Sequence, residues 1–194
     1  MSGRIWVISD THFGHANILN FKRNDGTPLR SFEDVQKMDE TMIRLWNERV
    51  HPEDHVYHLG DVVINKKFLS IIPRLMGKKR LVRGNHDIYK TREYIEAGFQ
   101  EIHGCRVFKA NEQQGTPGAI LTHIPIHPGS LPRWGINVHG HTHYQVVRDS
   151  AGHPDPKYVC VSVEHTDYAP VLLDDIVKGK KNVYKDRQAT GSML

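Results

Sequence analysis

Cysteine is nearly absent from this sequence of 194 residues, which contains only Cys105 and Cys160. Two cysteines so far apart do not form the closely spaced framework that staples small secreted domains. A chain of this length can also bury a sizeable core without disulfides. We therefore expect a reducing, cytoplasmic location and a fold that is held together by its core.

Long apolar runs are missing as well. No stretch approaches the roughly 18 consecutive apolar residues of a membrane-spanning helix, so we expect no membrane partner. The N-terminal apolar run is too short for a signal peptide. The balance of charge is mildly basic, with a formal net charge of +4. That excess favours acidic partners such as phosphates or nucleic acid, but it does not choose between them.

Five short apolar runs are each followed by a polar cluster. Runs of about four to six residues that are rich in valine and isoleucine and end in Gly or Asp are typical of buried strands. The expected strands are Arg4–Ser9, His55–Leu59, Arg80–Arg83, Ala119–Thr122 and Ile136–His139. Open α/β sheets bind their ligands at the carboxyl ends of the strands. The five polar clusters are therefore expected at such an edge.

Helical patterns lie between these runs. Ser31 followed by acidic residues is typical of a helix start, with Ser31 as the cap. The apolar side chains that follow at helical spacing are Val35, Met38, Met42 and Leu45. Shorter helices are expected at Lys66–Ile72 and Thr91–Ala97, and the alternating order predicts an α/β fold. Beyond His143 we expect further strands at Tyr144–Arg148, Tyr158–Val163 and Pro170–Leu173.

The chain is predicted to form one domain over residues 1–178. Residues 179–194 contain few apolar side chains and several basic ones, and we expect them to be a disordered basic tail.

The polar clusters carry carboxylates, imidazoles and an amide. Such ligands suit Mn²⁺, Fe, Zn²⁺ or Ni²⁺ better than Ca²⁺, which prefers oxygen ligands alone. No cysteine lies in any cluster, which argues against a structural thiolate zinc site. Two cations that lie close together need a shared anionic bridge, and an aspartate between two clusters is the natural bridge.

The clusters together resemble the calcineurin-like metallophosphoesterase superfamily. The motifs occur in the order of that family: Asp10-x-His12, Gly60-Asp61, Gly84-Asn85-His86-Asp87, His123 and Gly140-His141-Thr142-His143. The resemblance runs from about residue 4 to residue 178. The motifs at 10–15 and 161–164 also resemble a small, cap-less bacterial and phage branch. The family fold is a four-layer α/β/β/α sandwich of two packed mixed sheets flanked by helices.

The resemblance implies a role for each matching residue. The first metal ion would be bound by Asp10, His12 and His143, the second by Asn85, His123 and His141, and Asp61 would bridge both. His86 would lie beside the second site and contact the substrate. Mn²⁺ is the favoured metal. Two such ions lower the pKa of a bridging water, and the resulting hydroxide attacks phosphorus in line without a phosphoenzyme.

The remaining catalytic roles are open. His86 either stabilises the phosphoryl oxygens or protonates the leaving group. Asp87 is a candidate for holding His86 in the useful tautomer, although another carboxylate could do so. His15 and Asn17 are candidates for lining the phosphate pocket, and the alternative for His15 is to cap the next helix. His127 either reaches the substrate or lies in a surface loop.

The expected function is hydrolysis of a small phosphomonoester or phosphodiester, with a nucleotide-type substrate favoured. The alternative is a nuclease that acts on single-stranded nucleic acid. A non-catalytic scaffold on the same fold is disfavoured, because His86 and every ligand are present. The residues leave open the choice between monoester and diester, and also the oligomeric state.

Overall fold

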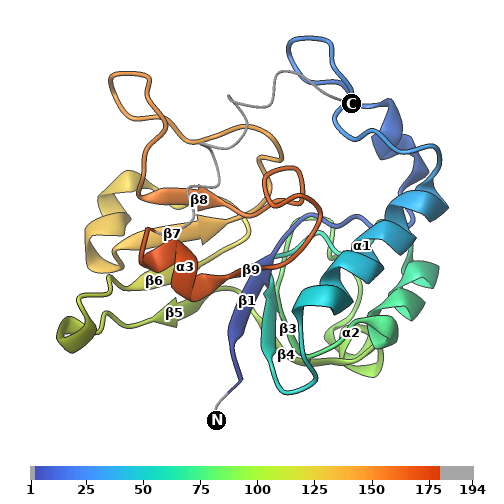
Figure 1. Cartoon of the computed structure of the whole chain (residues 1–194), viewed down its shortest axis with the longest axis horizontal. Coiled ribbons are helices and arrows are strands. Elements are labelled where there is room, and N and C mark those ends of the chain that lie inside the picture. Colours follow the sequence, from blue (N-terminus) through green and yellow to red (C-terminus); the bar gives the residue numbers. More distant parts are fainter. Residues whose placement is uncertain (1–2, 180–194) are drawn as a thin grey trace.

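Two β-sheets pack against each other in a computed structural model, which describes residues 3–179 of the chain (Figure 1). The first sheet has the order β4-β3-β2-β1-β9 and the second has the order β5-β6-β7-β8. The strands of the first sheet are β4 (Phe99–His103), β3 (Lys78–Val82), β2 (His55–His58), β1 (Ile5–Ile8) and β9 (Val171–Leu172). Those of the second are β5 (Arg106–Phe108), β6 (Ala119–Leu121), β7 (Ile136–His139) and β8 (Tyr158–Cys160).

Both sheets are mixed. In the first sheet β1 to β4 run parallel and β9 is antiparallel to β1. In the second sheet β6, β7 and β8 run parallel, and β5 is antiparallel to β6. Two mixed sheets with flanking helices confirm the predicted α/β fold class. The predicted tail lies outside the described residues, apart from Gly179.

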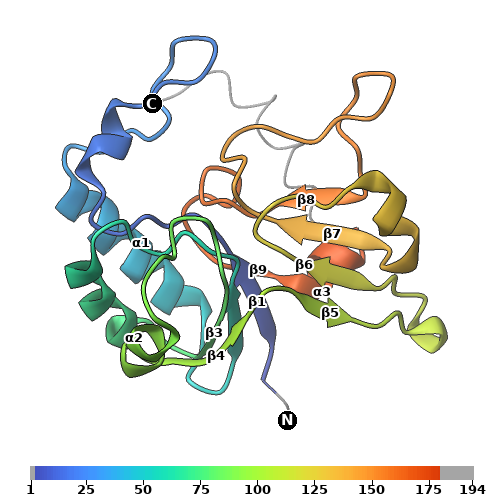
Figure 2. The same cartoon turned by 180° about the vertical axis from the view of Figure 1, so that it is seen from behind.

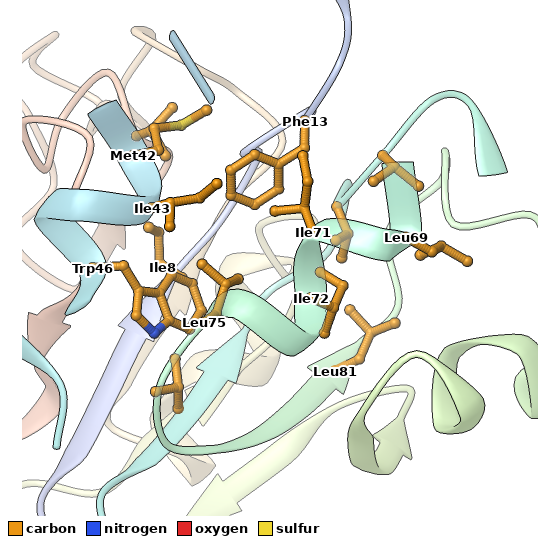
Figure 3. Packing of buried hydrophobic residues seen from close by; sticks show 14 of the residues in the cluster. Ile8, Phe13, Met42, Ile43, Trp46, Leu69, Ile71, Ile72, Leu75 and Leu81 are labelled. Atoms are coloured by element: carbon orange, nitrogen blue, oxygen red, sulfur yellow. The ribbon is translucent and has the colours of Figure 1, made fainter. Parts of the chain in front are cut away.

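Helices cover the outer face of the first sheet (Figures 1 and 2). They are α1 (Val35–Arg49), the 3-10 helix η2 (Lys66–Arg74) and α2 (Thr91–Glu96). Met42 and Trp46 of α1 and Ile72 of η2 belong to one buried cluster with Ile8 of β1 and Leu81 of β3 (Figure 3). The stripe predicted for α1 is confirmed in part: Met38 and Met42 are buried against the sheet, Val35 and Leu45 are half-buried, and Ile43 and Trp46 complete the buried face.

A second buried cluster lies between the two sheets. Val7 of β1 and Val82 of β3 meet Leu121 of β6 and Val138 of β7 there. The short helix α3 (Leu173–Val177), which the sequence did not predict, adds Leu173 and Ile176 to the same cluster. Strands β1 and β2 are therefore buried on both faces, which explains why most of their residues are buried apolar side chains.

The face of the second sheet that points away from the first sheet is covered by the 3-10 helix η4 (Pro128–Arg133) and the segment before it (Figure 2). The Ile126 amide donates to Asn137 Oδ1 over 2.9 Å, and the Tyr158 hydroxyl donates to the Ile126 carbonyl over 2.9 Å. Two other 3-10 turns are η1 (Ala16–Asn20) and η3 (Glu112–Gln114).

Three expectations differ from the structure. Helix α1 begins at Val35, and its cap is Asp34, which accepts from the Lys37 amide over 2.7 Å, rather than Ser31. Lys66–Arg74 is a 3-10 helix that contains Pro73, whose missing N–H disfavours a regular α-helix. Residues 144–148 form no strand and contribute only an isolated bridge between Arg148 and Pro154.

No helix among residues 3–179 combines the length and the apolar character that crossing a bilayer requires.

Candidate metal centre

The predicted polar clusters follow the carboxyl ends of parallel strands in the two sheets. They come after β1, β2, β3, β6 and β7, in the loops that carry Asp10 and His12, Asp61, Asn85 to Asp87, His123, and His141 and His143. Backbone hydrogen bonds hold neighbouring loops together: the Asp10 amide donates to the Gly60 carbonyl over 3.0 Å, and the Gly140 amide to the His123 carbonyl over 2.9 Å. The His141 amide, after β7, donates to Asp10 Oδ2, after β1, over 2.9 Å, so the clusters of the two sheets meet.

Two groups of side chains could each hold a metal ion. The first consists of Asp10, His12 and His143, and the second of Asp61, His123 and His141. Within each group the candidate ligand atoms all lie within 4.8 Å of one another. Asn85 joins the second group, because its Oδ1 lies 2.9 Å from His123 Nε2. The structure thus gathers all seven predicted ligands.

Asp61 lies between the two groups. One of its oxygens, Oδ2, is 3.7 Å from His12 Nε2 and 3.5 Å from His123 Nε2. The other oxygen, Oδ1, accepts a 2.9 Å hydrogen bond from the His86 amide. Burial raises the pKa of Asp61, and the neighbouring His123 opposes that rise. A cation beside the carboxylate would offset the cost of burial.

Several buried polar atoms in the first group have no hydrogen-bond partner among the described residues. They are Asp10 Oδ1 and both ring nitrogens of His12. Buried polar atoms are nearly always satisfied in proteins. Burial, and after it the charge of Arg30, holds the pKa of His12 well below its usual range, so this imidazole is neutral and can bind a cation. These unsatisfied atoms and the carboxylate, imidazole and amide donors fit divalent transition metals.

Hydrogen bonds orient two of the imidazoles. His123 Nδ1 lies 2.7 Å from the Leu59 carbonyl oxygen, which can only accept, so this nitrogen donates. His143 Nδ1 lies 3.1 Å from Glu164 Oε1. In both rings Nε2 is then the nitrogen left for a metal ion. Burial alone would lower the pKa of His143, but the hydrogen bond to Glu164 and the negative charge of Glu164 raise this pKa above its usual value.

A buried ion pair supports the first group from behind. Arg30 Nε donates to Glu164 Oε1 over 2.8 Å, and the same guanidinium donates to the carbonyl oxygens of Asp10 over 2.6 Å and Thr11 over 2.9 Å. Both side chains of the pair are fully buried. Arg30 thus holds the backbone that carries Asp10 and His12, while Glu164 holds His143. Sequence reasoning missed Arg30 entirely, and it saw Glu164 only as part of a motif.

Asp10 is fixed by two further donors. Its Oδ2 accepts from the Ser162 hydroxyl over 2.7 Å and from the His141 amide over 2.9 Å. Oδ1 is then the carboxylate oxygen that remains for a ligand. Ser162 was also missed, although it lies in the same motif as Glu164.

The backbone is strained at the candidate ligands. Positive φ angles occur at Asp10 (57°), His12 (47°), Asp61 (58°), His141 (68°) and His143 (50°). Such conformations are uncommon for residues other than glycine and cost about 1–3 kcal/mol each. Gly60, with φ of 95°, packs so closely that a Cβ would lie 2.5 Å from the Gly84 nitrogen. This concentration of strain supports a functional role for the edge.

Asp87 does not have the contacts that the sequence interpretation gave it. Its carboxylate accepts from three backbone amides, those of Asp61 and Gly84 over 2.8 Å and that of Val62 over 3.1 Å. Asp87 therefore joins the loop after β3 to the loop that carries Asp61, and none of its hydrogen bonds within residues 3–179 involves the His86 ring. We correct its role from orienting His86 to positioning Asp61.

The four remaining candidates lie in different surroundings. The exposed His86 has its ring centre 5.6 Å from that of His12, so it borders the first group as well as Asp61. His15 lies with its ring centre 5.8 Å from that of His12, and its side chain does not cap η1. Asn17 and His127 are exposed and make local contacts, with Asn20 Nδ2 and the Gly129 amide respectively. The structure gives neither a link to the metal groups.

Comparisons with known proteins identify a family model and several relatives that match this chain. The family model described as calcineurin-like phosphoesterase matches residues 3–145. An uncharacterized protein of Methanocaldococcus jannaschii is 34% identical over 180 residues, which cover 90% of each chain. The gene 66 protein of Mycobacterium phage D29 is 25% identical over 205 residues, which cover 90% of this chain and 98% of the phage protein. A solved structure, a protein of unknown function from Aquifex aeolicus, is 26% identical with a TM-score of 0.66, and the match covers 91% of this chain and 98% of that one.

Proposed function

Because this chain belongs to the calcineurin-like phosphoesterase family, we propose that it hydrolyses a small phosphomonoester or phosphodiester with the help of two divalent metal ions. A nucleotide-type substrate is favoured, and Mn²⁺ is the favoured metal. The observation that carries the proposal is the position of Asp61, whose Oδ2 lies within 3.7 Å of His12 Nε2 and 3.5 Å of His123 Nε2. A single carboxylate oxygen in reach of both groups suits a bridge between two cations.

The ligands would be shared between the two ions as follows. Asp10, His12 and His143 would hold one ion, Asn85, His123 and His141 would hold the other, and Asp61 would be shared. When bound, two such ions make a water molecule acidic enough to lose a proton near neutral pH and neutralise charge on phosphoryl oxygens. The neutral state of His12 supports its role as a ligand, because a metal-binding imidazole must be deprotonated.

The surrounding residues position these ligands and meet the substrate. Glu164 and the Leu59 carbonyl orient His143 and His123, and Ser162 orients Asp10. His86 is exposed beside His12, so its imidazole can reach a phosphoryl or leaving-group oxygen of a substrate held at the centre. No side chain needs to become phosphorylated in this scheme, because water is the nucleophile.

We also propose a cytoplasmic location. Cys105 is an exposed free thiol. An exposed free thiol suits a reducing compartment.

Replacing Asp61 by Asn tests the proposal, because it removes the shared charge and keeps the shape of the side chain. Chelator-treated protein is resupplied with Mn²⁺, Fe²⁺, Zn²⁺ or Ni²⁺, and hydrolysis of p-nitrophenyl phosphate and bis(p-nitrophenyl) phosphate is followed. Residues that merely support a metal ligand contribute about 10- to 100-fold. A bridging ligand should contribute more, so we expect activity to fall more than about 100-fold and at least one bound ion to be lost.

The matched control is Glu96→Gln, which neutralises an exposed carboxylate on α2 that pairs with Arg92. It should keep both the activity and the metal content of the wild type. Wild-type protein that holds almost no metal and hydrolyses neither ester, or Asp61→Asn protein that remains fully active, would refute the proposed function.

A further inference from the structure

A cavity of about 550 Å³ opens beside the metal centre. Its walls are Phe21, Lys22 and Leu29 on one side and residues 141–145 on the other. His141 and His143 in that wall belong to different metal groups, so the cavity borders both. Its volume falls in the range of small-molecule sites, about 300–1,000 Å³. A phosphoryl group held at the centre would therefore have this cavity beside it for an ester substituent.

The loop that forms one wall is tied to the loop that carries the metal ligands. The Tyr144 hydroxyl donates to Asn24 Oδ1 over 2.7 Å and accepts from the Asn24 amide over 3.0 Å. The guanidinium of Arg23 lies 5.7 Å from the centre of the Tyr144 ring. The base of the loop is closed by a 2.7 Å hydrogen bond from the Leu29 amide to the Phe21 carbonyl. The wall is thus held in place before any ligand arrives.

Phe21 presents an aromatic surface to this cavity. Its side chain is 43% exposed, although large apolar side chains of this protein are mostly buried. The His15 ring meets the Phe21 ring nearly at right angles (84°), with 5.8 Å between the ring centres. An exposed ring on a fixed backbone is a ready stacking surface for a planar group. Lys22 adds a positive charge next to it.

Building on the proposed function, we propose that this cavity holds the base of a nucleoside phosphoester, stacked on Phe21. A nucleobase has an apolar face and a polar edge, and the cavity offers the matching combination: Phe21 and Leu29 as apolar walls, Gln145 and Lys22 as polar ones. Phe21 thereby determines which phosphoesters are preferred, while the metal centre binds the phosphate that all of them share.

Two diesters with the same leaving group test the assignment. They are the p-nitrophenyl ester of thymidine 5′-phosphate and methyl p-nitrophenyl phosphate, which differ only in the group that would enter the cavity. The wild type should prefer the thymidine ester. Stacking of a base on an aromatic side chain is worth about tenfold or more. Phe21→Ala should therefore lower kcat/KM for the thymidine ester about tenfold, mainly through KM, and leave the methyl ester unchanged.

Controls separate stacking from simple apolar contact and from damage to the fold. Phe21→Trp keeps an aromatic face and should retain the preference, whereas Phe21→Leu should lose it. Ile95→Ala removes an apolar side chain of similar exposure, 42%, from α2, and should change neither ester. Equal losses for both esters in Phe21→Ala, or no loss for either, would overturn the assignment.

A binding measurement makes the result independent of turnover. Calorimetry with Mn²⁺-treated protein compares thymidine 5′-phosphate with inorganic phosphate. The wild type should bind the nucleotide about tenfold more tightly than phosphate, and Phe21→Ala should bind the two equally. Discrimination without any hydrolysis would support the cavity assignment while contradicting the proposed function. Equal affinity of the wild type for thymidine 5′-phosphate and inorganic phosphate would overturn the assignment. Tighter binding of a single-stranded oligonucleotide than of the mononucleotide would also overturn it, in favour of a polymer substrate.

Discussion

Glu164 offers a sharp test of how the first metal group is built. Its Oε1 accepts hydrogen bonds from Arg30 Nε over 2.8 Å and from His143 Nδ1 over 3.1 Å, and its side chain is fully buried. Burial would raise the pKa of Glu164, but the charge of Arg30 and the hydrogen bond from His143 lower it to about 2. The folded protein therefore contains an ionised, buried carboxylate on which two functional elements depend.

The change with the largest expected effect on stability is Glu164→Leu. Removing one partner of a buried ion pair costs about 3–5 kcal/mol, because the other charge is left uncompensated. Arg30 keeps the carbonyl oxygens of Asp10 and Thr11 as acceptors, so we expect the lower end, about 3 kcal/mol. Glu164→Gln keeps an acceptor for Arg30 and loses the charge, so about 2 kcal/mol is expected. Urea unfolding measures both values.

The functional consequence should be confined to one metal ion. Loss of the carboxylate that orients a ligating histidine weakens metal binding about 10- to 100-fold. His143 belongs to the first group, so Glu164→Gln should weaken one of the two binding steps in a Mn²⁺ titration and leave the other unchanged.

The control is Glu40→Gln, which breaks an ion pair with Arg74 at 2.6 Å between half-exposed side chains. Surface pairs contribute less than about 1 kcal/mol, and this one lies on α1, away from the metal groups. A Glu164→Gln protein that unfolds at the wild-type urea concentration and binds both ions with wild-type affinity would contradict this role of Glu164.

Two further predictions follow from buried contacts. Ser162→Ala removes the 2.7 Å hydrogen bond to Asp10 Oδ2 and should weaken binding of one Mn²⁺ ion about tenfold. Unchanged affinity for both ions in a Mn²⁺ titration would show that Asp10 does not need this hydrogen bond. Burial and, after it, the charge of His123 lower the pKa of His58 to about 3. The neutral imidazole therefore contributes its full free energy of unfolding above about pH 6.5, where histidine titrates in the unfolded chain. That contribution is lost as the pH falls from there toward the pKa of His58 in the folded protein. His58→Gln retains a polar partner for the Thr11 hydroxyl. In urea unfolding of metal-free protein it should reduce this loss by up to about 1.4 kcal/mol per pH unit. An unchanged dependence of the unfolding free energy on pH would count against a neutral, buried His58.

Most strands and the candidate metal ligands could be read from the sequence, because strand patterns are local and the polar motifs at the strand ends resemble those of the family. A buried parallel strand is a continuous apolar run, and the residue that ends it lies at the edge of the sheet. Five such runs therefore placed Asp10, Asp61, His123 and their neighbours near strand ends without any knowledge of tertiary contacts. Helix α1 was found for a similar reason, since one apolar face repeats at helical spacing.

Elements whose pattern is weak or whose partners are distant were missed or misread. The edge strand β4 carries mostly partly exposed side chains and gave no apolar run. Residues 144–148 resembled a strand, but Tyr144 instead bonds to Asn24, which is 120 positions away in the chain. Asp87 stands next to His86 in the sequence, yet its carboxylate turns to the amides of Asp61 and Val62. Adjacency in sequence therefore misassigned its role.

The amino-acid order alone pointed to the family, to the alternation of strands and helices, and to seven candidate metal-binding side chains. How those side chains are held became clear from the folded chain: Arg30 and Glu164 meet from positions 134 residues apart, and the loop of Phe21 closes one wall of the cavity beside His141 and His143. The difference arises from the distance along the chain over which each feature is set. Apolar periodicity is set by neighbours along the chain, whereas buried ion pairs and cavities arise from segments that become neighbours only when the chain folds.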